Sequence, residues 1–352
     1  MIPKGLTRPL SGCGHSRKAL PGLPPRDQTR RMVFLGFHAS HEQLPPSRLL
    51  AAVTRAESAG FDGAMCSDHL APWGVRQGES GYAWSWLGAA LASTSFSLGL
   101  VTAPGQRYHP VITAQAIATL EEMFPGRFWA ALGSGEAVNE HVTGDPWPPK
   151  PRRNARLEES VRVIRRLLAG DEVTHSGEVE VHRARVWSRP AAPPPLLAAA
   201  VTAETAGWAA GWADGLATVA QPRDVLAEVV AAYADAGGRG PRVLQVHVAL
   251  EDTEEAALAI LREQWRHAAI SGVSLWDIEQ PEDFDALAGD PTDEQLRGGA
   301  LVSADAGALA DRIAELAAVG FDRLYLHGVG TDQDAFLRRA ERDLLPALRR
   351  AL

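Results

Sequence analysis

Short apolar runs alternate with amphipathic segments along the chain from residue 33 onward. The first amphipathic segment has apolar residues at helical spacing, with Leu49, Leu50, Val53 and Ala56 on one face. Alternation of this kind predicts parallel strands joined by helices. Eight strands are predicted, over residues 33–37, 63–66, 98–102, 128–132, 196–200, 216–220, 243–250 and 323–327.

Helices are predicted between these strands, and two segments do not fit the simple alternation. Residues 173–186 alternate around Ser176-Gly177, which predicts an inserted β-hairpin after the fourth helix. About sixty residues between strands seven and eight predict a helical insertion. The predicted helices cover about residues 46–59, 85–92, 110–123, 155–168, 205–210, 225–236, 306–319 and 334–348.

A joint recurs where a predicted helix meets the next strand. Gly60-Phe61-Asp62 recurs as Gly320-Phe321-Asp322, and Asp214-Gly215 occupies the same place before strand six. Glycine supplies the left-handed turn that ends a helix. Eight such units predict a (β/α)8 TIM barrel. The alternative is an open doubly wound sheet, but no Gly-x-Gly-x-x-Gly motif follows the first strand.

Composition narrows the class of protein. The chain has 352 residues and a net charge of −8, and no basic stripe predicts a nucleic-acid partner. No run of 18 apolar residues predicts a membrane span. Cys13 and Cys66 have no CxxC partner, which argues against disulfides and zinc and favours the cytoplasm. Residues 1–31 lack a signal-peptide core, so we expect a disordered N-terminal extension, or a true start at Met32, before one domain over 32–352.

Polar residues follow the predicted strands, at the barrel end where active sites form. They are His38, His41 and Glu42 after the first strand, Asp68, His69 and Trp73 after the second, Gln106, Arg107, Tyr108 and His109 after the third, Gly133, Ser134, Gly135, Glu136 and Asn139 after the fourth, Thr202 after the fifth, and His327 after the eighth.

These residue types suit proton transfer beside a ring system. Histidine titrates near neutral pH, so His69 can accept or give a proton. A desolvated Glu136 can hold a proton, and Trp73 offers a flat apolar face. His38 and His41 are interpreted as loop histidines bonded to backbone, and with no third ligand we expect no metal. Arg107 has a second interpretation, as a brace of the rim.

The motifs resemble those of the luciferase-like flavin monooxygenase family, especially its branch of deazaflavin-dependent sugar-phosphate dehydrogenases. The resemblance runs from about residue 33 to the C-terminus. It is carried by the segments Gly36–Gln43, Ser67–Trp73, Arg107–Pro110, Phe124–Arg127 and Gly133–Glu140. It implies a (β/α)8 barrel with a flavin or deazaflavin in its mouth, a small-molecule substrate and, in many members, a dimer.

The resemblance also implies roles for individual residues. Val101-Thr102 resembles a strained bulge, often with a non-prolyl cis peptide, that backs the ring. We predict catalytic roles for His69, Glu136 and Trp73, cofactor contacts for Asp68, Val101, Thr102, Ser134, Gly135, Asn139, Ala199 and Ala200, and substrate contacts for Glu42, His38 and Arg107.

The sequence departs from the sugar-phosphate branch at two positions. Where that branch has a lysine after strand six, this chain has Val219-Ala220-Gln221-Pro222, and His38 replaces another lysine. A sugar phosphate is therefore not the expected substrate. The pattern is more similar to a subgroup that uses FMN, so we favour FMN, with coenzyme F420 as the alternative.

Two other classes of function stay open at this stage. Glu42 and Glu136 could be the paired carboxylates of a barrel glycoside hydrolase. A protein that only stores or carries a flavin is the other alternative, although a full set of proton-transfer residues argues against pure storage. The preferred hypothesis is a flavin-dependent oxidoreductase acting on a small organic substrate.

Overall fold

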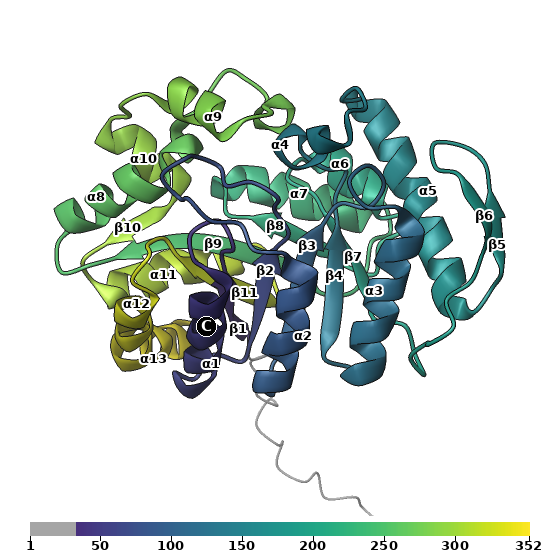
Figure 1. Ribbon diagram of the computed structural model, residues 1–352. Helices are drawn as coiled ribbons and strands as arrows, with labels where there is room; N and C mark the ends of the chain where they lie inside the picture. Colours follow the sequence, from purple (N-terminus) through teal and green to yellow (C-terminus); the bar gives the residue numbers. More distant parts are fainter. Residues whose placement is uncertain (1–32) are drawn as a thin grey trace, which may run out of the picture. The chain divides into compact units, whose positions relative to one another are not determined.

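Parallel strands form a closed barrel in the computed structural model, which describes residues 33–352 (Figure 1). The expectations for residues 1–31 and for a start at Met32 lie outside the described residues. Each strand pairs in parallel with its neighbours, and pairing of β8 with β9 closes the ring. Within residues 33–352 the eight barrel strands are β1 Phe34–Ala39, β2 Gly63–Ser67, β3 Ser97–Thr102, β4 Phe128–Leu132, β7 Leu196–Ala199, β8 Leu216–Val219, β9 Arg242–Leu250 and β11 Arg323–Gly328.

The predicted (β/α)8 barrel is therefore confirmed, and all eight predicted strands are present. One further parallel strand was missed: β10 (Leu301–Ser303) pairs with β9 outside the closed ring. It follows the segment of about residues 251–300 for which a helical insertion was predicted. A strand of three residues is too short to show an alternating pattern in the sequence.

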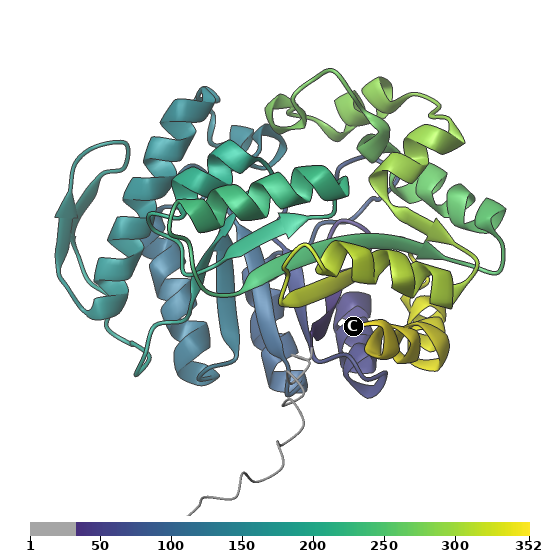
Figure 2. The same cartoon turned by 180° about the vertical axis from the view of Figure 1, so that it is seen from behind.

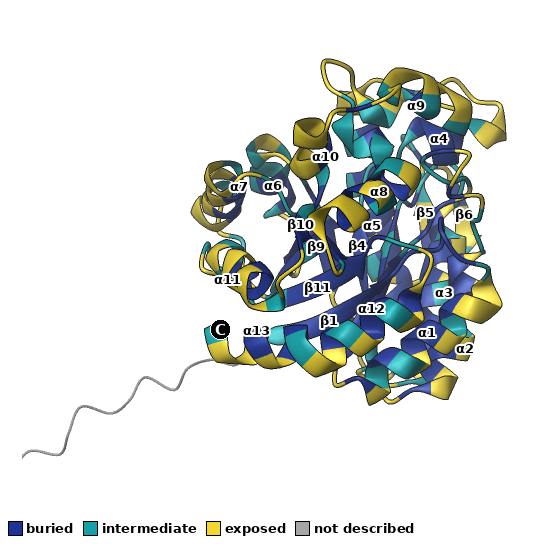
Figure 3. Cartoon of the chain, turned by 90° about the vertical axis from the view of Figure 1, so that its left-hand side faces the viewer, coloured by how far each residue is buried: buried dark blue, intermediate teal, exposed yellow. Residues whose placement is uncertain are grey.

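Helices cover the outside of the barrel with their exposed faces outward (Figure 3), and apolar residues of most of them pack in the main hydrophobic core. None of the helices in residues 33–352 has the length and apolarity needed to cross a bilayer. The predicted last helix is continuous but contains one π-helical turn, η4. The outer helices are α1 Pro46–Ser58, α2 Ala83–Ser93, α3 Pro110–Met123, α5 Lys150–Ala169, α6 Ala203–Ala209, α7 Arg223–Asp235, α11 Ala306–Ala317, α12 Gln333–Arg339, η4 Ala340–Leu344 and α13 Leu345–Ala351.

A hairpin packs outside the barrel, against α5 (Figure 2). It consists of β5 (Val173–His175) and β6 (Val181–Ala184), which pair antiparallel. Glu159 on α5 holds it, because its carboxylate accepts hydrogen bonds from the backbone N–H of Glu178 at 2.7 Å and lies 2.8 Å from His175 Nε2.

The insertion after β9 lies over the carboxyl ends of the strands, near α4 (Ala137–Glu140) and η1 (His141–Thr143) (Figures 1 and 2). Asp277 accepts hydrogen bonds from Trp147 Nε1 and Arg153 Nη1, both at 2.8 Å. Asp285 accepts one from the backbone N–H of Val75 at 2.9 Å. We call residues 251–300 the roof; its helical segments are α8 Glu254–Gln264, η2 Arg266–Ala269, η3 Leu275–Asp277, α9 Pro281–Ala288 and α10 Asp293–Gly299.

Small residues on the strands make room for large rings inside the barrel. Trp129 and Tyr325 lie in the interior, packed against each other at 5.7 Å. A Cβ added to Gly99 would lie 2.0 Å from the Trp129 ring, and one added to Gly36 would lie 2.2 Å from the Tyr325 ring. Glycine at these two positions is therefore a packing requirement.

Gly99→Ala is expected to lower the free energy of unfolding by about 1–3 kcal/mol, because the indole must shift within a packed interior. Gly88→Ala is the matched control: it lies within α2, and its added Cβ would have no neighbour within 4 Å. That variant should gain about 0.5–1 kcal/mol, since alanine favours helix. Chemical denaturation measures both, and wild-type stability of Gly99→Ala would contradict the packing argument.

Candidate active site

One nitrogen of His69 lies between two carboxylates at the barrel mouth. His69 follows β2, Glu42 lies in the loop after β1, and Glu136 lies between β4 and α4. His69 Nε2 is 3.6 Å from Glu42 Oε1 and 3.5 Å from Glu136 Oε2. Three loops that are distant in sequence therefore converge on one imidazole, as expected for strand ends of a barrel.

Glu42 is held as an anion. Burial alone would raise its pKa, but attraction to His69 and hydrogen bonds from two hydroxyls outweigh it and lower the pKa to about 2. Ser40 Oγ donates to Glu42 at 2.6 Å and Ser67 Oγ at 2.7 Å. A carboxylate with two donors and a basic neighbour keeps its charge despite burial.

Glu136 is shifted in the opposite direction. Burial raises its pKa and the charge of Glu42 adds to this, while His69, Arg107 and Asn139 oppose it. The two carboxylates on either side of His69 therefore differ in their affinity for a proton. Such a pair separates a fixed charge from a group that can hold a proton.

Asn139 fixes the orientation of the His69 ring. Its Oδ1 accepts a hydrogen bond from the backbone N–H of Leu70 at 2.8 Å, so its Nδ2 must face the other way. That Nδ2 donates to Glu136 Oε2 at 3.1 Å and lies 3.4 Å from His69 Nδ1. Nε2 is therefore the ring nitrogen that faces the two carboxylates and the barrel mouth, where a proton can be exchanged.

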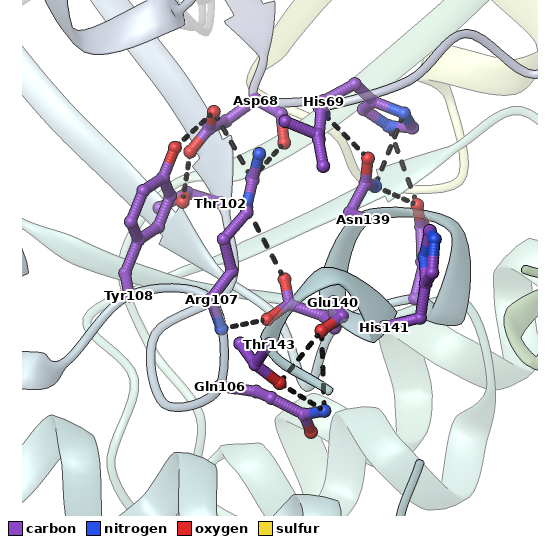
Figure 4. Close-up of polar contacts among 12 residues, drawn as sticks. Asp68, His69, Thr102, Gln106, Arg107, Tyr108, Asn139, Glu140, His141 and Thr143 are labelled. Carbon is purple, nitrogen blue, oxygen red and sulfur yellow. Dashed lines mark hydrogen bonds and ion pairs between the residues drawn. The ribbon is translucent and has the colours of Figure 1, made fainter. Parts of the chain in front are cut away.

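Asp68 and Arg107 brace the opposite side of this loop (Figure 4). Thr102 Oγ1 donates to Asp68 Oδ2 at 2.8 Å and Tyr108 Oη to Oδ1 at 3.1 Å. Arg107 Nη2 lies 3.3 Å from Asp68 Oδ1 and donates to the Asp68 carbonyl at 2.9 Å. The Arg107 guanidinium thus pairs with the Asp68 carboxylate, which agrees with the interpretation of Arg107 as a brace of the rim.

Glu140 completes this network and was missed as a site residue in the sequence. Its carboxylate accepts from the backbone N–H of Arg107 and lies 3.9 Å from the guanidinium Nε. Burial raises its pKa to about 7, although both interactions with Arg107 oppose the shift. Its position in the Gly-Ser-Gly-Glu-Ala-x-Asn-Glu block was the only signal in the sequence.

The ends of β3, β4 and β7 form a shallow face of small residues. The Gly133 N–H donates to the Thr102 carbonyl at 2.9 Å, and the Asp68 N–H to the Val101 carbonyl at 2.9 Å. A Cβ added to Gly133 would be in ordinary contact with Ala199 at 3.6 Å, so these two neighbouring residues present little side-chain bulk on this face. Such a face fits the planar ring of a flavin-type cofactor, and it would be filled by a larger residue.

The remaining residues predicted to contact the cofactor, Ser134, Gly135 and Ala200, differ in their surroundings. Ser134 Oγ accepts a hydrogen bond from Lys150 Nζ at 2.8 Å, and Gly135 has φ +85°. Ala200 packs toward the helices, with Ala206 and Leu216, so only its backbone faces the mouth. The expected cis peptide at Val101-Thr102 is wrong, because every peptide bond in residues 33–352 is trans.

The interpretation of His38 as a loop histidine was also wrong. His38 lies within β1, is 3% exposed and contacts the His327 ring at 5.0 Å. Burial lowers its pKa to about 4, so the ring is neutral. The apolar run of β1 predicted a strand that ended at residue 37, so His38 was expected in the loop that follows.

No group of three or more His, Cys, Asp or Glu in residues 33–352 is arranged to hold a metal ion.

Trp73 links His69 to an aromatic group that the sequence did not predict. Its ring is 4.9 Å from His69 and stacks on His267 of η2 at 5.3 Å and 10°. Phe284 of α9 meets its edge at 5.3 Å. The partners come from the roof, some 200 positions later in the chain, and no local pattern in the sequence marks them.

Comparison with known proteins identifies the family. Residues 29–323 match the family model described as luciferase-like monooxygenase. The chain belongs to the luciferase-like monooxygenase family. The resemblance stated from the motifs is therefore confirmed, and the barrel is that of a luciferase-like oxidoreductase.

Two curated members of the luciferase-like family are similar over most of the chain. The F420-dependent glucose-6-phosphate dehydrogenase of Intrasporangium calvum is 34% identical over 90% of this chain and 99% of its own. The protein of the same description from Beutenbergia cavernae is 36% identical over 90% and 98%. Both names describe oxidoreductases.

A solved structure is similar over the same extent. It is an F420-dependent secondary alcohol dehydrogenase in complex with an F420–acetone adduct, 28% identical, with a TM-score of 0.83 and coverage of 90% of this chain and 99% of its own. An F420-dependent tetrahydromethanopterin reductase of Methanopyrus kandleri, at 20% identity and a TM-score of 0.70, shares the fold.

The raised pKa of Glu140 predicts how stability depends on pH. The folded protein holds a proton that the unfolded chain releases above its ordinary pKa of 4.5, so this group's contribution to stability falls as pH rises from about 4.5 to 7. Glu140→Gln should remove that loss. The free energy of unfolding of the variant, relative to that of wild type, should therefore be about 1–3 kcal/mol higher at pH 8 than at pH 5.

Chemical denaturation at both pH values measures the difference. Glu122→Gln is the control, because Glu122 is an exposed carboxylate on the outside of α3. A pH dependence of Glu140→Gln equal to that of wild type would show that this carboxyl does not bind the proton.

Proposed function

We propose that this protein is a flavin-type oxidoreductase that acts on a small organic substrate at the barrel mouth, with His69 as the proton-transfer residue. The observation that carries the proposal is the position of His69 Nε2 between Glu42 and Glu136, whose pKa values are shifted in opposite directions. A flavin or deazaflavin ring on the flat face beside β3, β4 and β7 would supply the redox step, by accepting or giving a hydride or by reacting with oxygen.

The residues of the chain supply the proton chemistry. His69 Nε2 takes the proton of a substrate hydroxyl or returns it to a carbonyl oxygen. Glu42 stabilises the imidazolium that forms, because it keeps its negative charge. Glu136, whose pKa burial raises, binds a proton more readily than Glu42 beside the same nitrogen of the imidazole. Asn139 keeps the ring in the orientation that this transfer needs.

The remaining predicted residues form the walls. Trp73 shields His69 from water by stacking against the roof, and Asp68 and Arg107 hold the loop from behind. Val101, Thr102, Ser134, Gly135, Ala199 and the backbone of Ala200 would line the ring, while Glu42 and His38 lie on the substrate side.

The cofactor is one of two closely related rings. The F420-dependent relatives, similar over 90% of this chain, support coenzyme F420. The overall pattern of motifs, which is more similar to a subgroup that uses FMN, supports FMN, the form that the sequence favoured. The secondary alcohol dehydrogenase supports an alcohol or carbonyl compound as the substrate.

The glycoside hydrolase alternative receives no support from the site. The His69 imidazole lies between Glu42 and Glu136, where a hydrolase needs the scissile bond and a water molecule. Glu42 is also closed in by two serine hydroxyls.

Absorbance titration of the purified protein decides between the two rings. Binding of FMN or of coenzyme F420 should perturb the absorbance spectrum of the bound ring, and we expect one of them to bind at least about tenfold more tightly than the other. Failure of both to bind would contradict the proposed function.

His69→Ala should lower turnover by about 100- to 10,000-fold while cofactor affinity stays within a few-fold of wild type, since general acid–base catalysis contributes on that scale. His182→Ala is the matched control, because His182 is an exposed histidine of the hairpin. Full activity of His69→Ala would contradict the catalytic role. If no substrate reduces the bound cofactor in a single turnover, the protein is a flavin carrier.

A further inference from the structure

The mouth of the barrel has two halves of different chemistry. The flat face beside β3, β4 and β7 is described above. The half beside β1, β9 and β11 lies under the roof, and Trp73 connects it to His69. If the cofactor occupies the first half, the substrate reaches His69 from the second.

Three imidazoles surround one indole in this second half. The Trp265 ring lies 4.6 Å from His247, 4.5 Å from His267 and 4.8 Å from His327. We call these four residues the cage. They come from β9, β11 and the roof, and His267 stacks directly on Trp73. The cage thus extends the wall of the mouth outward from the proposed catalytic histidine.

The cage carries no charge at neutral pH. Burial lowers the pKa of His247 and of His267 to about 3, and it lowers that of His327 as well. His327 Nε2 lies 2.7 Å from Gln43 Oε1, and the Nδ1 atoms of His247 and His327 are 2.8 Å apart. Both ring nitrogens of His327 are thus engaged within the protein, so a bound hydroxyl or carbonyl group would meet Nε2 of His247 and the ring nitrogens of His267.

The roof above the cage is strongly acidic. Residues 251–300 contain thirteen Asp and Glu, three Arg and no Lys, a formal charge of −10 in a chain whose net charge is −8. Its arginines are already engaged: Arg262 pairs with Asp293, Arg297 pairs with Glu254 at 2.7 Å, and Arg266 donates to two backbone carbonyls.

Cations elsewhere around the mouth are engaged as well. Lys150 is the only lysine in residues 33–352, and it donates to Ser134 on the cofactor half. Arg76 pairs with Glu263 at 2.9 Å, and Arg107 lies between Asp68 and Glu140. A buried phosphate dianion needs paired cations or it costs several kcal/mol. Among the described residues of the roof, Arg266 is the one arginine paired with carbonyls rather than a carboxylate, and those two hydrogen bonds hold its guanidinium against Arg262 and Gly289.

We propose that the cage and the acidic roof make the substrate half of the mouth selective for an uncharged hydroxyl- or carbonyl-bearing compound and exclude phosphate esters. This inference rests on the proposed function, because it names the substrate class of the same site. It separates the chain from the relatives named for glucose 6-phosphate.

The test compares two probes that differ by one phosphoryl group, glucose and glucose 6-phosphate, together with 2-propanol and acetone as small uncharged probes. Calorimetry and the absorbance spectrum of the bound cofactor report binding without turnover. We expect the phosphate ester to bind at least about tenfold more weakly than the best uncharged probe. Lower salt should weaken its binding further, since the roof repels it, and should leave the uncharged probes unaffected.

Equal or tighter binding of the phosphate ester would overturn the proposal, and so would failure of every uncharged probe to bind. The two proposals fail differently. If neither FMN nor coenzyme F420 binds, the proposed function is wrong, while calorimetry on the cofactor-free chain still compares the probes. If a cofactor binds and the ester is preferred, only the substrate class is wrong.

A variant tests the cage itself. His267→Lys places a cation beside Trp73 and should raise the affinity for glucose 6-phosphate relative to glucose by about tenfold or more. Ser271→Lys is the matched control, because it adds the same charge at an exposed position of the roof and should leave the ratio unchanged. His267→Gln keeps the site neutral and should keep the wild-type ratio of the affinities for glucose 6-phosphate and glucose. Wild type and this variant therefore test the proposal even if His267→Lys fails to fold.

Discussion

Closure of the sheet by pairing of β8 with β9 is the constraint on which the rest of the structure depends. Because every barrel strand is parallel, closure brings all the carboxyl ends to one rim. Glu42, His69 and Glu136 follow three of these strands and therefore meet, although nearly a hundred residues separate the first from the last. Large rings inside the barrel, with glycine opposite them, hold the strands at the spacing that closure requires.

Burial at this rim determines which groups carry charge. Every polar group there loses water, but only some of them gain partners that replace it. Glu42 gains two hydroxyl donors and His69, and it stays ionised. Glu136 and Glu140 gain less, so burial dominates and their affinity for protons rises. The histidines of the cage contact one another and the indole of Trp265, which do not offset burial, so their pKa values fall and they stay neutral. The same burial thus gives an anion, two proton-binding carboxyls and a set of uncharged rings within one mouth.

The sequence predicted the parts of this arrangement that depend on periodicity and strand order. Apolar runs and the Gly-x-Asp joints located all eight strands, and the rule that barrel sites follow strands brought His69, Glu42, Glu136 and Asn139 together. The sequence could not locate Trp265 and His267, because they act through contacts between the roof and Trp73 that leave no local pattern. It also misplaced His38, since a histidine inside a barrel strand looks like one just after it. The short strand β10 and the role of Glu140 were not predicted for the same reason, because each depends on a partner distant in the chain.

The two halves of the mouth proposed for cofactor and substrate are built from different parts of the chain. The cofactor half is built on strand ends β3, β4 and β7, where backbone and small side chains leave a flat face and the only lysine of the described chain lies nearby. The proposed substrate half is built largely from the roof, an insertion that packs on the barrel through Trp265 beside His247 and His327 and is tied at its edge by Asp277 with Arg153. Changes in the roof can therefore alter the charge and shape presented to the substrate without moving His69 or its carboxylates. Under the proposed function, the proton-transfer residues sit on the barrel strands' own loops, while the charge that meets the substrate is set by the roof.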